Sequence, residues 1–436
     1  MPTIKLYDDD AYTTTFSAKV LSCTPADTLQ NEPDDSTCRY AIELDRTAFF
    51  PEEGGQTPDR GAITITGDGH IPDAAASADG PYTHGSTDGS CAHKSVNSPC
   101  AYESGEGCVR VLDVQLADDT ILHFCDAPLP AGALVTGRID WPHRYSNMQQ
   151  HTGEHIFSGI VHSALGYDNV GFHLSDNIVT MDYNGAITDE QIADFEQRAN
   201  EWIFKNVPVT ACYPSVDDLC ATDYRSKDGI RGAVRIVTIE GCDICACCAP
   251  HVASTGEVGI LKVIDRTPYK GGIRLSILCG MRALLDYREK QNTLTALSRL
   301  LSKPMGELAA RTEALFAERD DLKQQLYLAK KEQLDAMVAA VPVAQNNVCL
   351  FISSCDMNLA RKTVNLLTEA HPGYCAICVG TDTGGYSFIL GSAEGRANEA
   401  ADMLRKRLSA KCGGKDAMIQ GSIHASADAI RELFYS

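Results

Sequence analysis

Four cysteines and a histidine crowd into one short segment of this sequence, CDICACCAPH at residues 242–251. Earlier in the chain, the segment HTGEH places His151 and His155 four residues apart. Side chains at that spacing project from one face of a helix, so both imidazoles would point the same way. Cys247 and His251 repeat the spacing. Thiolate and imidazole groups are zinc donors, and two short-spaced pairs on separate elements predict a single zinc site made of these four residues.

The other cysteines of the segment have no assigned role. Cys242 and Cys245 would need a second closely spaced cysteine pair to build a separate all-cysteine zinc site, and none stands nearby. Cys248 neighbours a predicted ligand, so it either lines the pocket or simply packs. The chain holds 18 cysteines, but its length of 436 residues and a first segment without a secretory signal favour free thiols and metal ligands over disulfides.

The chain is acidic overall and basic in two places. A formal charge of −20, from 38 basic and 58 acidic residues, argues against a sequence-blind polyanion binder. Residues 262–311 contain ten Lys or Arg against four Asp or Glu, and residues 401–415 contain five against one. These segments are either nucleic-acid docking faces or ordinary solvated helix faces. No apolar run reaches the length of a membrane span, so we expect a cytoplasmic protein.

The hydrophobic pattern indicates an α+β protein. Residues 1–140 alternate apolar and polar positions and predict a β-rich, barrel-like domain, interrupted by a flexible insertion rich in Gly, Ser and Asp at 66–108. Cys91, Cys100 and Cys108 lie in or beside the insertion, and their spacing matches no metal site. The insertion therefore receives no functional assignment.

Three further regions follow the β-rich domain. Residues 141–281 predict a zinc-containing α/β domain, with the HTGEH helix, a helical stretch at 189–206 and a strand leading into the cysteine cluster. Residues 282–343 predict a long helical linker broken near Pro304, where Ser302 would cap the second helix. Leucines then recur at sevens, as in a coiled coil, at Leu308, Leu315 and Leu322.

The last region, residues 344–436, predicts a small α/β domain. Its pattern has the order βαββαβα, with the CGGK segment as a loop. Cys375 and Cys378 have the CxxC spacing of many metal sites, but they fall inside an apolar strand and are interpreted as core thiols.

At this point the motifs match a known family. HTGEHIFSG followed by CCAPHVASTGEVGILKVIDRTPYKGGIRL resembles the editing domain of alanyl-tRNA synthetases and the free-standing AlaX-type alanyl-tRNA editing proteins. FFPEEGGQTPDRG resembles the glycine-rich N-terminal motif of that family, and AKCGGKDAMIQGSI resembles the C-terminal DHH-associated domain of the synthetase. A long helical linker with that terminal domain is similar to the long form of AlaX.

The chain departs from the family at two places. The second motif is Cys-Cys-Ala-Pro-His, where the family often shows Cys-Gly-Gly-Thr-His, so the ligand positions survive while the pocket wall between them changes. The C-terminal glycine run is shortened to Gly413 and Gly414, so the family's nucleic-acid contacts at this run do not carry over directly to this chain. No class II synthetase catalytic core is recognisable, so aminoacylation is not expected.

The resemblance implies a zinc-dependent hydrolase that removes a wrong amino acid, serine foremost and glycine second, from alanine tRNA. Thr152 would then read the serine hydroxyl and Glu154 would act as acid or base; alternatively, Thr152 bonds its own backbone and Glu154 is a solvated or supporting carboxylate. Arg144 would reach the tRNA end or serve in a surface ion pair. The remaining candidates for contact with the substrate or the tRNA are Met148, Gln149, His173, Gly54, Gly55, Gln56, Lys270, Gly272, Arg274, Lys411 and Lys415.

Two other functions stay open on the sequence. HTGEH also fits HxxEH, the motif of inverzincin metallopeptidases, in which the glutamate is the general base. A four-ligand zinc site is typical of structural zinc, so a non-catalytic tRNA-binding protein is the second alternative. In the editing protein, residues 344–436 would be the tRNA-binding domain, and the long helix would set its distance from the active site. Either the long helix or this C-terminal domain would pair two copies into a homodimer.

Overall fold

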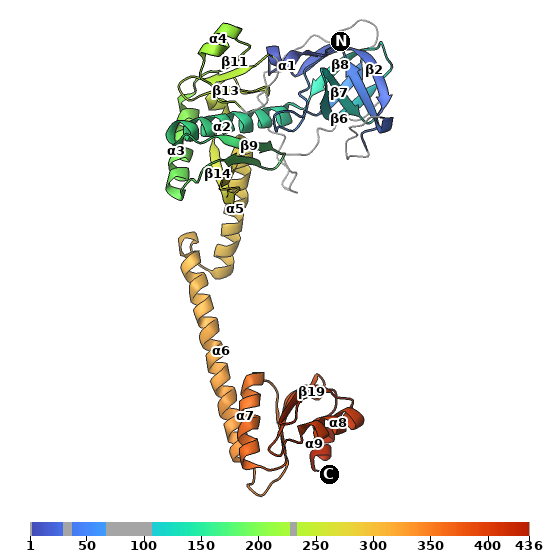
Figure 1. Ribbon diagram of the computed structural model, residues 1–436, viewed down its shortest axis with the longest axis vertical. Coiled ribbons are helices and arrows are strands. Elements are labelled where there is room, and N and C mark those ends of the chain that lie inside the picture. Colours follow the sequence, from blue (N-terminus) through green and yellow to red (C-terminus); the bar gives the residue numbers. More distant parts are fainter. Residues whose placement is uncertain (1, 29–36, 67–106, 227–232, 436) are drawn as a thin grey trace. The chain divides into compact units, whose positions relative to one another are not determined.

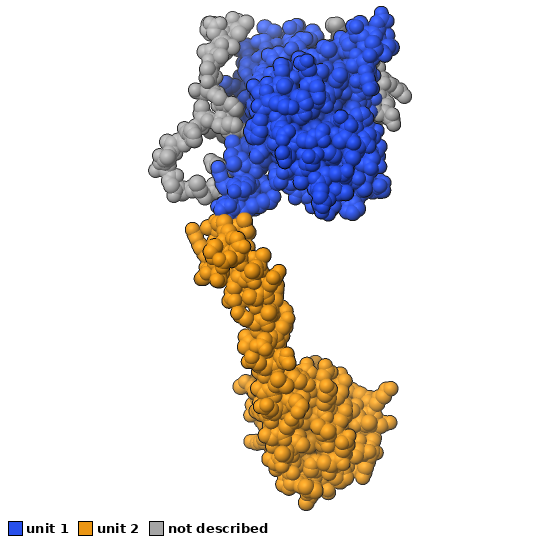
Figure 2. Space-filling view, turned by 90° about the vertical axis from the view of Figure 1, so that its left-hand side faces the viewer, with its two compact units in different colours: residues 1–292 blue, residues 293–436 orange. Residues whose placement is uncertain are grey.

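The computed structural model describes residues 2–28, 37–66, 107–226 and 233–435, arranged in two units. The first unit comprises Met1–Asn292 and the second Thr293–Ser436, and Figure 2 shows them in blue and orange. The predicted insertion at 66–108, including Cys91 and Cys100, lies almost wholly outside the described residues. Among the helices of the described part, none is both long and apolar enough to span a bilayer.

The first unit begins with a closed six-stranded barrel, which confirms the predicted barrel-like domain (Figure 1). Along the first barrel strand, alternate residues Phe16, Ala18 and Val20 face the core, as the period of two requires. Closure pairs every strand on both sides, in the order β2-β3-β7-β6-β5-β8. The strands are β2 (Thr15–Pro25), β3 (Tyr40–Leu44), β5 (Gly61–Ile65), β6 (Cys108–Ala117), β7 (Thr120–Cys125) and β8 (Leu134–Ile139).

Three short elements accompany the barrel. Strand β1 pairs in parallel with β4, and helix α1 follows β1 directly. Their bounds are β1 (Ile4–Lys5), α1 (Leu6–Asp9) and β4 (Arg46–Thr47).

A long helix, α2 (Trp141–Leu165), carries the HTGEH motif through the interior of the unit. Asp140 caps its start by accepting a hydrogen bond from the backbone N–H of His143, and Gly166 ends it in the left-handed conformation with φ 68°. Residues 147–161 are buried on every side of the helix. Two elements approach it so closely that only glycine fits, because a Cβ at Gly153 would lie 2.3 Å from a cysteine sulfur and one at Gly159 would lie 2.6 Å from a backbone carbonyl.

Two antiparallel sheets pack against α2. One has the order β14-β15-β10-β9 and the other β11-β12-β13. The predicted helix at 189–206 is confirmed as α3 (Asp189–Lys205), which starts with a Thr188–Gln191 capping box. The other bounds are β9 (Asn169–Leu174), β10 (Val179–Tyr183), β11 (Val209–Cys212), α4 (Val216–Ala221), β12 (Ile236–Ile239), β13 (Asp243–Ala246), η2 (Thr255–Val258), β14 (Leu261–Tyr269), β15 (Gly272–Cys279) and α5 (Gly280–Leu301).

The break in the long helical region differs from the prediction. Helix α5 ends at Leu301, and Ser302 adopts φ 51°, so it terminates the first helix and does not cap the second. A short 3-10 turn, η3 (Met305–Glu307), precedes α6 (Leu308–Ala339). The predicted leucine row begins at the buried Leu308 and reaches Leu322, which is 63% exposed.

The second unit ends in a five-stranded sheet with the order β16-β17-β18-β20-β19. The CGGK segment was predicted as a loop, and this is wrong: it forms the edge strand β19, because its backbone pairs along its whole length with β20. Cys375 and Cys378 are buried in β17, which confirms them as core thiols. The elements are β16 (Val348–Ile352), α7 (Met357–Ala370), β17 (Tyr374–Thr381), β18 (Gly385–Ser392), α8 (Ala397–Leu408), β19 (Lys411–Lys415), β20 (Met418–Ile423) and α9 (Ala427–Tyr435).

Candidate metal centre

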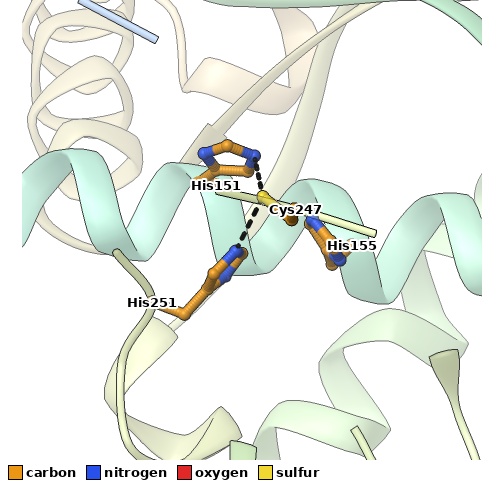
Figure 3. A group of neighbouring side chains, drawn as sticks. All are labelled: His151, His155, Cys247 and His251. Atoms are coloured by element: carbon orange, nitrogen blue, oxygen red, sulfur yellow. Dashed lines mark hydrogen bonds between the residues drawn. The ribbon is translucent and has the colours of Figure 1, made fainter. Parts of the chain in front are cut away.

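The four residues predicted as zinc ligands meet at one point of the first unit (Figure 3). His151 and His155 project from successive turns of α2. Cys247 follows β13 directly, and His251 lies just beyond it in the chain. The nitrogen and sulfur atoms that could hold a metal all lie within 4.8 Å of one another. Distant parts of the sequence therefore place three imidazoles and one thiol around a common point.

Each imidazole is held through its Nδ1 atom. The Nδ1 atom of His151 lies 2.8 Å from Oε1 of Gln56, and that of His155 lies 3.1 Å from Oδ2 of Asp243. The Nδ1 atom of His251 lies 3.0 Å from the hydroxyl oxygen of Thr152. Partners of this kind fix the ring orientation and the tautomer of metal-binding histidines.

The Nε2 atoms of His151 and His251 lie at the distance from the Cys247 sulfur that a zinc tetrahedron requires. Nε2 of His151 lies 3.5 Å from Sγ of Cys247, and Nε2 of His251 lies 3.4 Å from it (Figure 3). With zinc–nitrogen bonds of about 2.0–2.1 Å and zinc–sulfur bonds of about 2.3 Å, a tetrahedral N–S edge measures about 3.5 Å. The donor set and its spacing therefore fit a zinc ion.

Burial shifts the pKa values of His251 and Cys247. It lowers the pKa of His251 well below the usual value, and the neighbouring His155 and His151 lower it further, so the ring is neutral and keeps a lone pair. Burial also raises the pKa of the Cys247 thiol well above its usual value, with Cys248 adding to the effect. A cation at this point would offset that cost, because a metal ligand must be the thiolate.

Asp243 was not predicted, and it supports the centre through His155. Burial would raise the pKa of its carboxyl, but hydrogen bonds from Arg225 and His155 hold the pKa below its usual value. Arg225 donates two hydrogen bonds of 2.7 Å to the carboxylate. Asp243, His155 and Cys245 also lie close enough for a metal, but the arginine occupies the carboxylate and opposes a second cation.

A cavity of about 790 Å³ opens beside the centre. His151, His155 and Cys247 form part of its wall. Glu154 lines it as well, and its Oε1 accepts hydrogen bonds from Ser158 at 2.6 Å and Asn169 at 2.7 Å. The remaining polar lining is Lys5, Glu53, Asp118, Asp119, Asp168, Asn169, Tyr213, Arg225, Ser226 and Arg235.

The glycine-rich loop lies at the centre, as expected. Gly54 lines the cavity, and Gln56 is the partner of His151. Gly54 and Gly55 have φ of 64° and 84°, which only glycine adopts readily, so together they make the tight turn between Glu53 and Gln56.

Several predicted contact residues lie elsewhere. Arg144 was expected either to reach the tRNA end or to serve in a surface ion pair; it does form an ion pair, with Asp59, but it is fully buried because its face of α2 is covered by the barrel domain. Met148 is a core residue, and Gln149 donates a hydrogen bond to the backbone of Glu257.

Thr152 and His173 were also predicted to contact the substrate, and their surroundings differ from that prediction. Thr152 is fully buried; besides its contact with His251, its hydroxyl accepts a hydrogen bond from the Val252 N–H at 3.3 Å. His173 is exposed on β9, because residues alternate along a strand. The ring facing the site is that of Phe172, whose centroid lies 4.7 Å from that of His151.

The basic candidates lie at two edges. Lys270 and Gly272 lie in the β14–β15 hairpin and Arg274 on β15, where it pairs with Asp182. Lys411 and Lys415 are exposed on β19 of the second unit.

Comparison with known proteins finds similarity to alanine–tRNA ligases and to alanyl-tRNA editing proteins. The family model "Threonyl and Alanyl tRNA synthetase second additional domain" matches residues 234–275, which contain Cys247 and His251. An alanine–tRNA ligase from Ignicoccus hospitalis is 26% identical over 381 residues, covering 85% of this chain and 36% of the ligase. The alanyl-tRNA editing protein Aarsd1 of Mus musculus is 27% identical over 302 residues, covering 67% of this chain and 62% of that protein.

The chain thus spans less than two thirds of the length of these two relatives. The editing protein Aarsd1 of Danio rerio is 24% identical over 432 residues, and there the match covers 95% of this chain and 93% of the relative. The resemblance predicted from the motifs is therefore confirmed, and the chain is similar to alanyl-tRNA editing proteins and to alanine–tRNA ligases.

Proposed function

We propose that the protein hydrolyses the ester between a wrong amino acid and the 3′ end of alanine tRNA, with serine as the main amino acid and glycine as the second. The observation that carries the proposal is the convergence of His151, His155, Cys247 and His251 beside a cavity large enough for an aminoacyl group. The named function of the relatives agrees with it. Because aminoacyl-tRNA is consumed in translation, the reaction would protect translation fidelity in the cytoplasm.

Ester hydrolysis needs an attacking water and stabilisation of the developing oxyanion. A zinc ion bound at this centre would supply both, by acidifying water and polarising the ester carbonyl. Gln56, Asp243 and Thr152 each hold one ligand ring in place. Thr152 is then a positioning residue for His251.

The cavity wall offers groups for the remaining tasks. Glu154 places its carboxylate beside the centre, with Oε2 3.8 Å from Nε2 of His155, where it can accept a proton from water. Glu154 and Asn169 also present polar atoms to the cavity. A serine hydroxyl bonded there would favour serine over alanine, because alanine would leave a buried polar group unpaired.

The basic edges are proposed to hold the tRNA. Lys270, beside Gly272 at the β14–β15 hairpin, would contact phosphates near the acceptor end, and Arg274 would support it from its pair with Asp182. Lys411 and Lys415 of β19 would bind the tRNA body. The exposed leucine face of α6 is proposed to pair with a second copy of the chain.

The rival functions predict different behaviour. An inverzincin uses a downstream glutamate as third ligand and has no need of a cysteine, whereas Cys247 lies within the ligand cluster here. Four protein ligands favour structural zinc, so a binding protein that leaves its tRNA charged is the stronger rival.

One assay decides between these functions. Purified wild-type protein and His151→Ala are incubated with alanine tRNA carrying radiolabelled serine. We expect serine release from the wild type and background release from the variant. Equal rates for the two proteins would rule out hydrolysis at this centre.

A further inference from the structure

A rigid turn holds Glu53 in the wall of the cavity beside the metal centre. The turn closes with a 3.1 Å hydrogen bond from the Gln56 N–H to the Glu53 carbonyl. Gly55 cannot be replaced without moving a neighbour, because a Cβ there would lie 2.3 Å from the backbone oxygen of Phe172. The position of Glu53 is therefore fixed by its own turn and by β9.

The same turn contacts the centre on both sides. Gln56 bonds to His151, and a Cβ at Gly54 would lie 3.4 Å from the sulfur of Cys248, the neighbour of the ligand Cys247. Glu53 and Gly54 line the cavity together with the ligands. Glu53 thus forms part of the wall of the space in which the proposed function places the reacting ester.

Glu53 differs from Glu154, another carboxylate in that wall. Glu154 accepts hydrogen bonds from Ser158 and Asn169, whereas Oε2 of Glu53 is buried and has no hydrogen-bond partner within the described residues. A buried carboxylate oxygen without a donor is unfavourable, so such a group gains when a cationic donor enters the cavity. Glu53 is therefore prepared for a ligand with a positively charged donor.

We propose that Glu53 binds the α-ammonium group of the aminoacyl ester, so that the centre acts on esters of amino acids with a free α-amine. The inference rests on the proposed function and names the class of its substrates. The α-ammonium is attached to the carbon next to the ester carbonyl, so holding it also orients that carbonyl toward the metal centre. Esters whose α-nitrogen is blocked or replaced lack this charge-assisted hydrogen bond.

The experiment compares two esters of the same tRNA. One carries serine, and the other carries the α-hydroxy acid in which a hydroxyl group replaces the α-amine, which has similar size but no positive charge. The rate of each enzymatic reaction is divided by the spontaneous hydrolysis rate of the same ester. We expect the wild type to prefer the seryl ester, in kcat/KM, on the order of 10- to 100-fold, the range of a charge-assisted hydrogen bond. Glu53→Gln is expected to bring the ratio close to one.

Two variants control for general damage. Glu52→Gln removes the neighbouring carboxylate, which is exposed and bonded to Gln115, and its ratio should equal that of the wild type. Glu53→Asp keeps the charge on a shorter side chain and should give an intermediate ratio. Bound zinc and thermal unfolding are measured for every variant.

The outcomes distinguish a failure of the role of Glu53 from a failure of the proposed function. A folded, zinc-loaded Glu53→Gln with an unchanged ratio, or with equal losses on both esters, overturns the role of Glu53 while serine release by the wild type still supports the proposed function. A wild type that releases neither acid overturns the proposed function itself. If Glu53→Gln is unstable, an unchanged ratio in Glu53→Asp together with equal binding of both esters overturns the inference.

Discussion

His123 lies inside the barrel with none of its surface exposed, and the histidines of the metal centre are 2–5% exposed. In the barrel, Nδ1 of His123 donates to the Ile42 carbonyl and Nε2 accepts from the Thr47 hydroxyl, so both nitrogens are satisfied by barrel residues. In the centre, each ring is held by a partner at Nδ1, and the Nε2 atoms of His151 and His251 face Cys247.

Burial alone therefore does not distinguish a structural histidine from a ligand. The barrel uses the imidazole as a neutral core group with two hydrogen bonds. The centre uses it as a directed donor, because the second nitrogen points to a place where several donors meet. The arrangement of partners around each ring is the physical difference between the two regions.

The largest expected effect comes from removing the sulfur on which the imidazoles converge. Cys247→Ala should weaken zinc binding by on the order of 100- to 1000-fold, one ligand's share of the apparent free energy of a four-ligand site. Serine release should fall to background. Zinc content by atomic absorption and the release assay measure the two effects.

The neighbouring cysteine provides the control for this change. Cys248→Ser should keep its zinc, since Cys248 is not among the four clustered donors. Equal zinc losses in both variants would contradict the ligand assignment.

The barrel histidine should respond to acid. Burial lowers the pKa of His123 from 6.5 to about 4, so the unfolded chain takes up a proton between those values and the folded chain does not. Its contribution to stability is complete above pH 6.5 and is lost as the pH falls toward 4, by about 3 kcal/mol in total. Urea unfolding of wild type and His123→Gln at pH 7 and pH 4 should show the difference between them shrinking by that amount. A difference that does not change with pH would refute this prediction.

A smaller effect should follow from loosening one ligand ring. Asp243→Asn removes the charge that orients His155, and we expect zinc affinity to fall 10- to 100-fold, as for comparable supporting residues. Competition with a chelator measures the affinity. Glu240→Gln, at an exposed carboxylate near the same segment, should bind zinc like the wild type.

The smallest expected effects come from substitutions in the second unit, whose residues lie far along the sequence from the metal centre. Lys411→Gln and Lys415→Gln should each weaken tRNA binding modestly and reduce the slope of binding against salt concentration by about one. Filter binding at several salt concentrations tests this. Lys331→Gln on α6, whose lysine pairs with Asp335, should leave the slope unchanged.

The sequence was most informative where functional residues a few positions apart lay within one regular helix or strand. His151 and His155 could be placed on one helix face because the pattern around them is strongly helical, and α2 confirms the helix. The barrel strands followed from alternation, and Cys375 was recognisable as a core thiol from its apolar neighbours. These features depend on local periodicity.

The rest depends on contacts between distant segments. Asp243 lies inside the cysteine cluster, but its role needs Arg225 and His155 to approach it from other elements. Arg144 shares a helix with the histidines, and only the packed barrel domain reveals that Asp59 meets it. Neighbouring residues of a strand face opposite sides, and the ring at the site is that of Phe172 and not, as predicted, that of His173. The CGGK segment is a strand because it pairs with β20, and the local sequence pattern does not indicate that pairing.

The division of the four donors between two places in the chain has a consequence for biosynthesis. Ninety-two positions separate His155 from Cys247, so at ordinary rates of synthesis the second pair of donors is made roughly 5–20 s after the first. All barrel strands precede Trp141 and can close while the ribosome is still at work. The four donors therefore cannot come together until Cys247 and His251 have been made, whereas the barrel can close without them.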